Sequence, residues 1–474
     1  MRGSCASDDD SSSGSCGVVH HEQQLELDDS VSPELNDLVP LSVDAPVCTD
    51  DNVYLSRSHH IKMVLIDCCD YSCNRRYLMA ILFISLSFIG SVLVVLTKLF
   101  HQSLPNLLHF GGNYINHKEP ICLSTQLLEG NTISAENMIL NRIATAFNNK
   151  LIGDDNILAS GFLWNDDDAK TSKWRPQGVT TMHTENGFRF ALVSWYGRAD
   201  EGYADRGGRV SFVNLTDMPF DEFPSDNIPD ISFYKYSHVL LVDESFCTLP
   251  GIHVGGIEYQ NGTLYVADSR KGQQSIIEFD VANDLYEVPS SMEPLLGYRY
   301  LLQASSSFHT PIKPSFFSYD IDNHKFLVGT YEKCGTETIH SHQDSTDCFH
   351  QNKNKLLWFD KGKINLTSPL PCEHYFPEMQ GAVSLNWQDE TVIWTSSSYG
   401  AVSNSHLHSL RTSRFGGGCP NVDLEAAEIN TYLFPPGLED LHIEEAKNSK
   451  ARLLWSQTEF GVRQVFAVPI RQLL

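Results

Sequence analysis

The sequence predicts an all-β protein that is attached to a membrane by one helix near its N-terminus. Three observations lead to this prediction. An apolar run of 21 residues lies near the start, strand-like segments repeat along the chain after it, and the last repeat lacks one strand. These features divide the chain into a tail, a membrane anchor and a large β domain.

The apolar run, residues 77–97, contains no charged side chain and is flanked by Arg75-Arg76 and Lys98. At about 1.5 Å per residue, a helix of this length spans roughly the 30 Å of a bilayer's hydrocarbon core. A buried helix of a soluble protein is the alternative, but such helices rarely stay apolar on every face over this length. We therefore expect a transmembrane helix.

Two features orient this helix with its N-terminus in the cytosol. Cations are more frequent before the run than after it, as the positive-inside rule requires. All three N-x-[ST] sequons follow the run and predict glycosylation on a lumenal or extracellular side, at Asn214, Asn261 and Asn365. Because 76 residues precede the run, we interpret it as an uncleaved signal-anchor of a Golgi, endosomal or plasma-membrane protein.

The segments around the anchor have distinct compositions. Residues 1–76 are acidic and rich in Ser and Pro, which predicts a disordered cytosolic tail. Residues 98–133 contain Pro and paired Gly and form an expected stem. In residues 134–148, a capping-type Ser134 precedes apolar residues at helical spacing, which predicts a short amphipathic helix.

The twelve cysteines divide evenly between the two sides of the membrane. Six would face an oxidising compartment, where three disulfides and fifteen connectivities are possible: Cys122, Cys247, Cys334, Cys348, Cys372 and Cys419. We favour Cys334 with Cys348, because that bond closes a short polar loop. On the cytosolic side, palmitoylation and unmodified thiols both remain open for the cysteines nearest the bilayer, Cys68, Cys69 and Cys73.

From residue 157 to residue 474 the chain repeats one pattern at intervals of roughly sixty to eighty residues. Each repeat opens with small or polar residues, continues as a strand, turns, and returns as a second strand of alternating apolar residues, which is typical of a β-hairpin. The repeats open at Gln177, Gly255, Ser315, Gln380 and Glu439. About four strands per repeat predict a β-propeller.

Closure of the ring gives a second argument for a propeller. The last repeat has only three strands, and the segment Ile157 to Trp164 lies before the first repeat, where it could supply the fourth. We expect five blades over residues 157–474, with six possible because the repeat spacing is uneven. A β-sandwich followed by a second β domain is the competing architecture.

Several motifs resemble those of secreted, propeller-like proteins of unassigned function. They are KWRPQGVTT from Lys173, HVGGIEYQNGTLYVADS from His253, MQGAVS from Met379 and LLWSQTEFGVRQVFAV before Pro469. The chain is also distantly similar to strictosidine synthase-like and paraoxonase-like type II membrane propellers. The first resemblance implies the fold and transfers no catalytic residue. The second implies a calcium ion on the propeller axis held by Asn, Asp and Glu, a ligand set that this sequence does not match position by position.

The inner strands of a propeller start around one channel, so polar residues at the repeat openings should converge. These candidates are Gln177, His253, Gln380, Glu439 and Asp440, with Asp268, Glu332 and Glu459 from the ends of second strands. They would bind a ligand, or a cation such as Ca²⁺ at Glu439 and Asp440. The simpler interpretation is that they cap strands and bind channel water.

Other motifs indicate less. His340, His342 and His350 could hold zinc, but an exposed loop with a disulfide fits them better. The acidic triplet Asp166–Asp168 resembles a glycosyltransferase metal motif, yet the required strand–helix alternation is absent, so we expect a solvated turn. A net charge of −25 without a basic stripe makes nucleic acid an improbable partner.

Together these features predict a membrane glycoprotein that displays a ligand-binding propeller, with a carbohydrate, protein or small molecule as its ligand. The alternatives are a calcium-dependent hydrolase or lactonase-like enzyme with an axial site, and a Golgi glycosyltransferase. No motif decides whether the protein is an enzyme.

Overall fold

The computed structural model divides the chain into two units, Met1–Leu108 and His109–Leu474, and all described residues belong to the second. The predicted anchor, tail and palmitoylation cysteines, as well as Glu332, Cys334, Cys348 and Asn365, lie outside the described residues. Within the described part of the chain, no helix is both long and apolar enough to cross a membrane. The described residues are 120–128, 130–153, 157–218, 232–270, 273–291, 293, 297–331, 354–360, 372–373, 378–398, 400–401, 403–413, 429–445 and 451–474.

The described chain is nearly all β and has a β-propeller-like organisation of antiparallel four-strand runs. The first run is β3 (Trp174–His183), β4 (Arg189–Gly197), β5 (Gly208–Asn214) and β6 (Phe233–Val242). The second is β7 (Ile257–Gln260), β8 (Thr263–Asp268), β9 (Ser275–Asp280) and β11 (Tyr300–His309). The third is β12 (Phe316–Asp320), β13 (Lys325–Gly329), β14 (Lys355–Phe359) and β15 (Cys372–Glu373).

Two further runs complete the series. One is β16 (Met379–Trp387), β17 (Glu390–Ser397), β18 (Ser405–Ser413) and β19 (Ile429–Phe434). The last is β20 (Leu438–Glu445), β21 (Arg452–Thr458), β22 (Gln464–Pro469) and β2 (Ile157–Leu163). In it, β2 pairs antiparallel with β22, with Gly161 opposite Phe466. The strand that the sequence predicted to close the ring is therefore confirmed.

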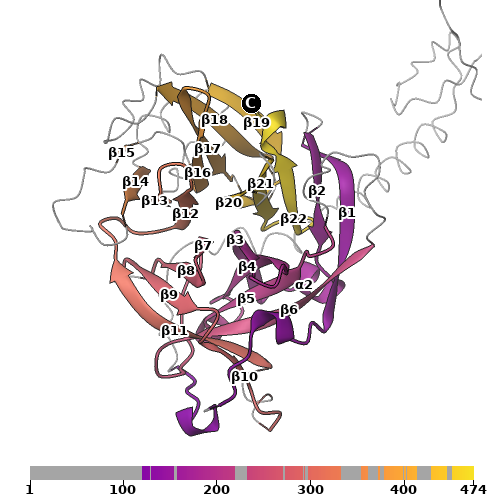
Figure 1. Ribbon diagram of the computed structural model, residues 1–474, viewed down its shortest axis with the longest axis vertical. Helices are drawn as coiled ribbons and strands as arrows, with labels where there is room; N and C mark the ends of the chain where they lie inside the picture. Colours follow the sequence, from indigo (N-terminus) through magenta and orange to yellow (C-terminus); the bar gives the residue numbers. More distant parts are fainter. Residues whose placement is uncertain are drawn as a thin grey trace, which may run out of the picture. The chain divides into compact units, whose positions relative to one another are not determined.

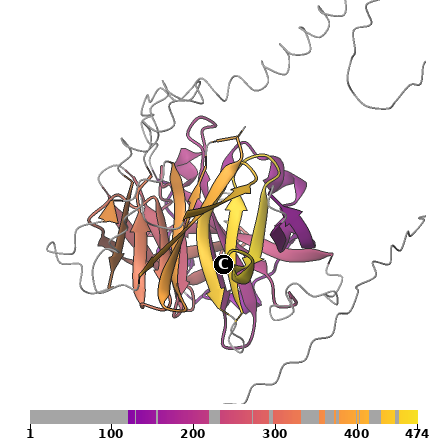
Figure 2. The ribbon, with the colours of Figure 1, turned by 90° about the horizontal axis from the view of Figure 1, so that it is seen from above.

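The first strand of each run contacts the first strand of the next, and the series returns to its start. β3 lies against β7, β7 against β12, β12 against β16, β16 against β20, and β20 against β3. Figure 1 shows these inner strands facing a common centre, and the turned view in Figure 2 shows the orange and yellow strands of the last two runs side by side.

Glycine at the strand openings permits this close approach. A Cβ on Gly178 in β3 would lie 2.9 Å from the backbone nitrogen of Ile257 in β7. A Cβ on Gly381 in β16 would lie 2.8 Å from the Cα of Asp440 in β20. The small residues that open the repeats in the sequence therefore have a packing role.

The core consists of apolar layers between neighbouring runs. Each layer takes side chains from two runs, because alternate residues of a strand point to opposite faces of its sheet. Representative pairs that share a layer are Phe212 with Leu264, Tyr265 with Phe317, Phe316 with Ile393, Trp394 with Leu454, and Trp455 with Trp195. The last of these layers joins the final run to the first.

The predicted helix over residues 134–148 is wrong. A single 3-10 turn, η3 (Ala135–Asn137), is followed by strand β1 (Arg142–Ile152). β1 pairs antiparallel with both β2 and β6 and so links the last run to the first. The apolar residues at helical spacing do not share one buried face, since Ile143 is 54% exposed. Pairing with two strands therefore decided the structure of this segment over its local helical pattern.

A second link lies between the first and second runs. The first part of β11 pairs parallel with β6 and antiparallel with β10 (Leu285–Glu287), and its later part pairs with β9. The remaining short elements are η2 (Thr125–Leu127), α2 (Asp166–Lys170), η4 (Ala204–Arg206) and η5 (Ile470–Gln472).

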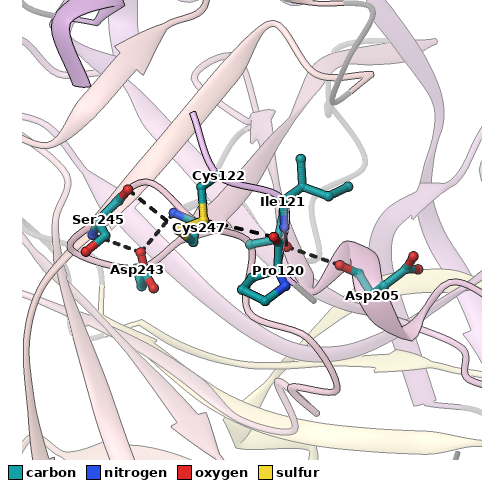
Figure 3. Close-up of a disulfide and its surroundings, with 8 residues drawn as sticks. Pro120, Ile121, Cys122, Asp205, Asp243, Ser245 and Cys247 are labelled. Carbon is teal, nitrogen blue, oxygen red and sulfur yellow. Dashed lines mark hydrogen bonds between the residues drawn. A yellow bond between two sulfur atoms is a disulfide. The ribbon is translucent and has the colours of Figure 1, made fainter. Parts of the chain in front are cut away.

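A disulfide joins Cys122 to Cys247 (Figure 3). Cys122 belongs to the predicted stem, and Cys247 lies in the turn after β6. Backbone hydrogen bonds accompany the disulfide, with Leu123 N donating to the carbonyl of Phe246 at 3.2 Å. The disulfide therefore attaches the end of the stem to the β domain, in a pairing that the sequence left open among fifteen connectivities.

Candidate functional site

Two of the predicted axial acids, Glu439 and Glu459, form a buried pair. Glu439 is the second residue of β20, and Glu459 directly follows β21. Their side chains share a hydrogen bond. Burial, together with the charge of Glu459 and the hydrogen bond to it, raises the pKa of Glu439 well above its usual range. The pair therefore holds a proton well above the pH at which an exposed carboxyl loses it.

Three side chains surround Glu459. Tyr196 donates its hydroxyl to Glu459 Oε1 at 3.4 Å, and Arg175 Nε lies 3.7 Å from the same oxygen. Arg463 donates its Nε to the Glu459 carbonyl at 3.2 Å. The ring of Tyr196 also lies 4.1 Å from the ring of His253, so this predicted residue is brought beside the acid pair.

His253 is a neutral neighbour of the pair. Burial, with a smaller effect from the charge of Lys313, lowers the pKa of His253 to about 4. The imidazole therefore adds no positive charge that would stabilise an ionised Glu439 at neutral pH.

Asp440 is fully buried beside the pair, and its Oδ2 accepts from the backbone N–H of Ile257 at 3.3 Å. Burial raises the pKa of Asp440, against the opposing effect of the hydrogen bond from Ile257. The buried oxygens Glu439 Oε1, Asp440 Oδ1 and Gln457 Oε1 have no hydrogen-bond partner. Even so, the described residues contain no group of three or more His, Cys, Asp or Glu that could hold a metal. The raised pKa values of Glu439 and Asp440 favour bound protons at this cluster.

The other predicted site residues are placed as follows. Gln177 is buried in β3 and donates its side-chain amide to the Pro176 carbonyl at 3.1 Å. Gln380 is half-buried in β16. Asp268 lies at the end of β8, where its carboxylate binds Arg270 Nη2 at 2.6 Å. No contact among the described residues joins Asp268 to the acid pair.

Of the predicted glycosylation sites, Asn261 is exposed in the turn between β7 and β8. Asn214 ends β5, and its side-chain oxygen accepts from Thr216 N at 2.9 Å. Glycosylation at both sites stays a prediction.

A pocket of about 360 Å³ lies where β1, β3 and β5 begin. Its walls come from these strands, from η4 and β6, and from the segment before β11. Arginines outnumber acids among the lining residues by four to one. The lining residues are Asn141, Arg142, Trp174, Tyr203, Arg206, Arg209, Ser237, His238, Glu293, Gly297, Tyr298 and Arg299.

One buried carboxylate organises the floor of this pocket. Asp168 of α2, 3% exposed, accepts from Arg209 Nη2 and Arg142 Nη1, each at 2.9 Å. It also accepts from the Tyr236 hydroxyl at 2.6 Å and bonds His238 Nε2 at 3.0 Å. Burial alone would raise the pKa of Asp168, but the hydrogen bond from His238, the charge of Arg209 and the bond from Tyr236 hold it far below the usual range. Asp168 is therefore ionised.

Arg209 lies within cation–π distance of two indole rings. Its guanidinium carbon lies 4.6 Å from the ring centre of Trp174 and 4.8 Å from that of Trp195. Nη1 reaches the Tyr298 hydroxyl at 3.5 Å, whereas the Nε–H is buried without an acceptor. Arg209 is therefore a fixed cation whose Nε–H is buried and unpaired.

The histidine of the pocket adds no charge. Burial, followed by the charge of Arg209, lowers the pKa of His238 to about 3. Its Nδ1 accepts from Ser211 Oγ at 2.8 Å, and Ser211 Oγ accepts in turn from Trp195 Nε1, which assigns the Nε2 proton to the bond with Asp168. The positive charge of the pocket comes from its arginines.

Arg463 connects the pocket to the axial acids. Its Nη1 donates to the Asp168 carbonyl at 2.9 Å, while its Nε donates to the Glu459 carbonyl. Burial, with the neighbouring charge of Arg175, lowers the pKa of Arg463 to about 10. The two sites are thus separated by one guanidinium.

The pocket was missed at the sequence level. We expected Asp166–Asp168 to be a solvated turn, which holds for the exposed Asp166 and is wrong for the buried Asp168. Asn165, which caps α2 by accepting from Asp168 N at 3.0 Å, was the available signal for a helix here. The glycine-rich segment from Gly197 to Arg209 supplies three lining residues.

Comparisons with known proteins do not identify a function for this chain. No family model matches the chain, and no curated protein matches it. Among solved structures, an exo-1,5-α-L-arabinanase from a bovine ruminal metagenomic library is similar at a TM-score of 0.29 and 11% identity, over 62% of this chain and 92% of its own. A Trypanosoma rangeli sialidase in complex with sialic acid has a TM-score of 0.28 and 6% identity, over 71% and 58%. Likeness at this level carries no argument about fold or ligand.

Proposed function

We propose that this protein binds a small ligand in the pocket around Arg209, and that it is a single-pass type II membrane glycoprotein. In this proposal each four-strand run is one blade of a five-bladed propeller. The ring of contacts among inner strands and the pairing of β2 with β22 support that blade count. The anchor would display the domain in the lumen or outside the cell.

The pocket is the observation that carries the proposal. Its volume of about 360 Å³ lies within the range of small-molecule sites, which are about 300–1,000 Å³. Its walls combine the aromatic rings of Trp174, Tyr203 and Tyr298 with several fixed hydrogen-bond donors. This combination of apolar surface and a few oriented polar groups is typical of ligand sites.

A thermal-shift screen tests the proposal. The full-length chain in detergent is screened against neutral monosaccharides, acidic monosaccharides and small organic acids. We expect at least one compound to raise the Tm saturably. In Asn141→Trp, an indole placed on the exposed rim residue Asn141 fills the pocket and should abolish the shift. Glu244→Trp places the same ring on an exposed turn away from the lining residues and should leave the shift intact. A screen with no saturable shift counts against ligand binding.

A hydrolase that uses the axial acids is the second candidate. The raised pKa of Glu439 favours it, because a carboxyl that retains its proton can act as a general acid. We propose this hydrolase without calcium, because a protonated Glu439 needs no cation to balance its charge. Hydrolysis of chromogenic ester, lactone or glycoside substrates that disappears in Glu439→Gln would support it. A glycosyltransferase is disfavoured by the nearly all-β chain.

A further inference from the structure

We propose that the ligand of this pocket is a small organic anion, in which a ring or short chain carries one carboxylate, phosphate or sulfate group that binds Arg142 and Arg209. This inference rests on the proposed function, since it names the chemical class of the ligand for the same pocket. The shared chemistry is a compact group of anionic oxygens beside an apolar body.

The charge balance at the pocket floor gives the first argument. Asp168 contacts both Arg142 and Arg209, so one negative charge faces two positive charges. The side chains of Asp168 and Arg209 are almost fully buried, at 5% and 6% exposed, where an unbalanced charge is costly. An anion that enters the pocket would complete the neutralisation that Asp168 begins.

The donors available at the two arginines give the second argument. A guanidinium has five N–H donors. Arg142 donates Nη1 to Asp168 and also bonds Tyr236, so only some of its five N–H donors are used. Its side chain lines the pocket and is 34% exposed. Arg209 also lines the pocket, and its buried Nε–H has no acceptor. Guanidinium groups bind carboxylate and phosphate oxygens in paired, directional hydrogen bonds.

The shape of the arginine site gives the third argument. Arg209 loses little side-chain entropy on binding, because Trp174, Trp195 and Asp168 already fix its guanidinium. Asp168 thus acts as the positioning residue that holds two mutually repelling arginines on one floor.

The walls of the pocket define the rest of the ligand. Trp174 packs edge-on against Tyr203 at 5.9 Å and Tyr298 at 6.3 Å, so aromatic surface lies next to the arginines. Burial raises the pKa of Tyr298, which keeps its hydroxyl neutral. Aromatic faces of this kind pack against the C–H surface of a ligand ring. The rim arginine Arg299 is already paired with Glu287, at 2.6 Å.

Isothermal titration of the full-length chain in detergent at low salt tests the inference. The probes are D-glucuronate, D-glucose 6-phosphate, D-glucose 6-sulfate and neutral D-glucose, so that the arms separate the three anion types on one sugar. We expect at least one anion to bind saturably and at least tenfold more tightly than D-glucose. Which anion binds identifies the group.

Variants separate a built site from general charge attraction. Arg142→Gln removes a half-exposed arginine, so the chain should fold, and we expect at least tenfold weaker anion binding; Arg142→Lys should be intermediate. Lys235→Gln removes an exposed cation of β6 that does not line the pocket and should have little effect. Equal weakening by Arg142→Gln and Lys235→Gln would overturn the inference.

The outcomes also separate this inference from the proposed function. If D-glucose binds as tightly as the three anions and Asn141→Trp abolishes that binding, the pocket binds a ligand but the anion class is wrong. If no probe binds and no compound of the wider screen shifts the Tm, the proposed function and the inference both fail.

Discussion

The axial acid pair and the arginine pocket are both buried, yet their acids behave in opposite ways. Glu439 is 1% exposed and Asp168 is 3% exposed. Burial raises the pKa of Glu439, which faces another carboxyl, whereas the pKa of Asp168 stays far below its usual range because two arginines, a tyrosine and a histidine donate to it. The partners of a buried acid, rather than its burial, decide whether it is charged.

The same contrast appears within one strand. Glu444, at the opposite end of β20 from Glu439, binds Arg189 through Nε and Nη2 and accepts from Trp455 Nε1 at 2.7 Å. Burial is outweighed by the charge of Arg189 and the hydrogen bond from His183, which lower the pKa of Glu444 to about 2. β20 therefore carries one protonated and one ionised glutamate.

The largest effect is expected from Asp168→Asn. This change leaves Arg142 and Arg209 without their shared counter-ion, and removing one partner of a buried ion pair costs about 3–5 kcal/mol. Urea unfolding of the full-length chain measures the loss. Asp166→Asn, an exposed position of the same helix, should leave the free energy of unfolding unchanged. Equal free energies of unfolding for the two variants would contradict the role of Asp168 as the shared counter-ion of Arg142 and Arg209.

The next largest effect is expected from the two glutamates of β20. Glu444→Gln removes the charge that Arg189 requires and should cost about 2–3 kcal/mol. Glu439→Gln replaces a protonated acid with an amide of the same shape and should cost less than about 1 kcal/mol. Denaturant midpoints compare the pair. A larger loss for Glu439→Gln would show that Glu439 is ionised.

The two glutamates should also respond oppositely to pH. The folded pKa of Glu444 is depressed to about 2, so its stabilisation is present above 4.5 and is lost as the pH falls from 4.5 toward 2. The folded pKa of Glu439 is raised, so its contribution is present below 4.5 and is lost as the pH rises. Glu439→Gln should therefore become more stable relative to the wild type with rising pH above 4.5. Parallel pH curves for the two proteins would exclude a protonated Glu439.

The smallest effect is expected from metal removal. A protonated Glu439 needs no cation to balance its charge, so treatment with a chelator should leave the Tm unchanged. Elemental analysis of a chelator-free preparation provides the control. Stoichiometric calcium together with a lower Tm after chelation would restore the calcium-dependent hydrolase.

The sequence predicted the fold better than the site. Repeated hairpins and the missing strand were visible because strand alternation and glycine at strand openings are local patterns, and both recur in the structure. β1 was mistaken for a helix because its partners β2 and β6 come later in the chain, and only pairing made it a strand.

The candidate site was predicted in part. Glu439 and Asp440 at the start of β20 lie near Glu459 because β21, which ends at Thr458, pairs antiparallel with β20, with Thr458 opposite Leu438. The pocket could not be found in this way, since Arg142, Asp168 and Arg209 come from β1, α2 and β5. Their proximity depends on how β1 is added to the first run, which no local pattern records.

The central claim is that the charged arginine pocket takes the ligand, while the protonated axial pair does not. The most direct test is titration of the wild type, Asn141→Trp and Glu439→Gln with whichever of D-glucuronate, D-glucose 6-phosphate and D-glucose 6-sulfate binds the wild type. The account predicts that Glu439→Gln binds as the wild type does and that Asn141→Trp does not bind. Loss of binding in Glu439→Gln with retention in Asn141→Trp would contradict it.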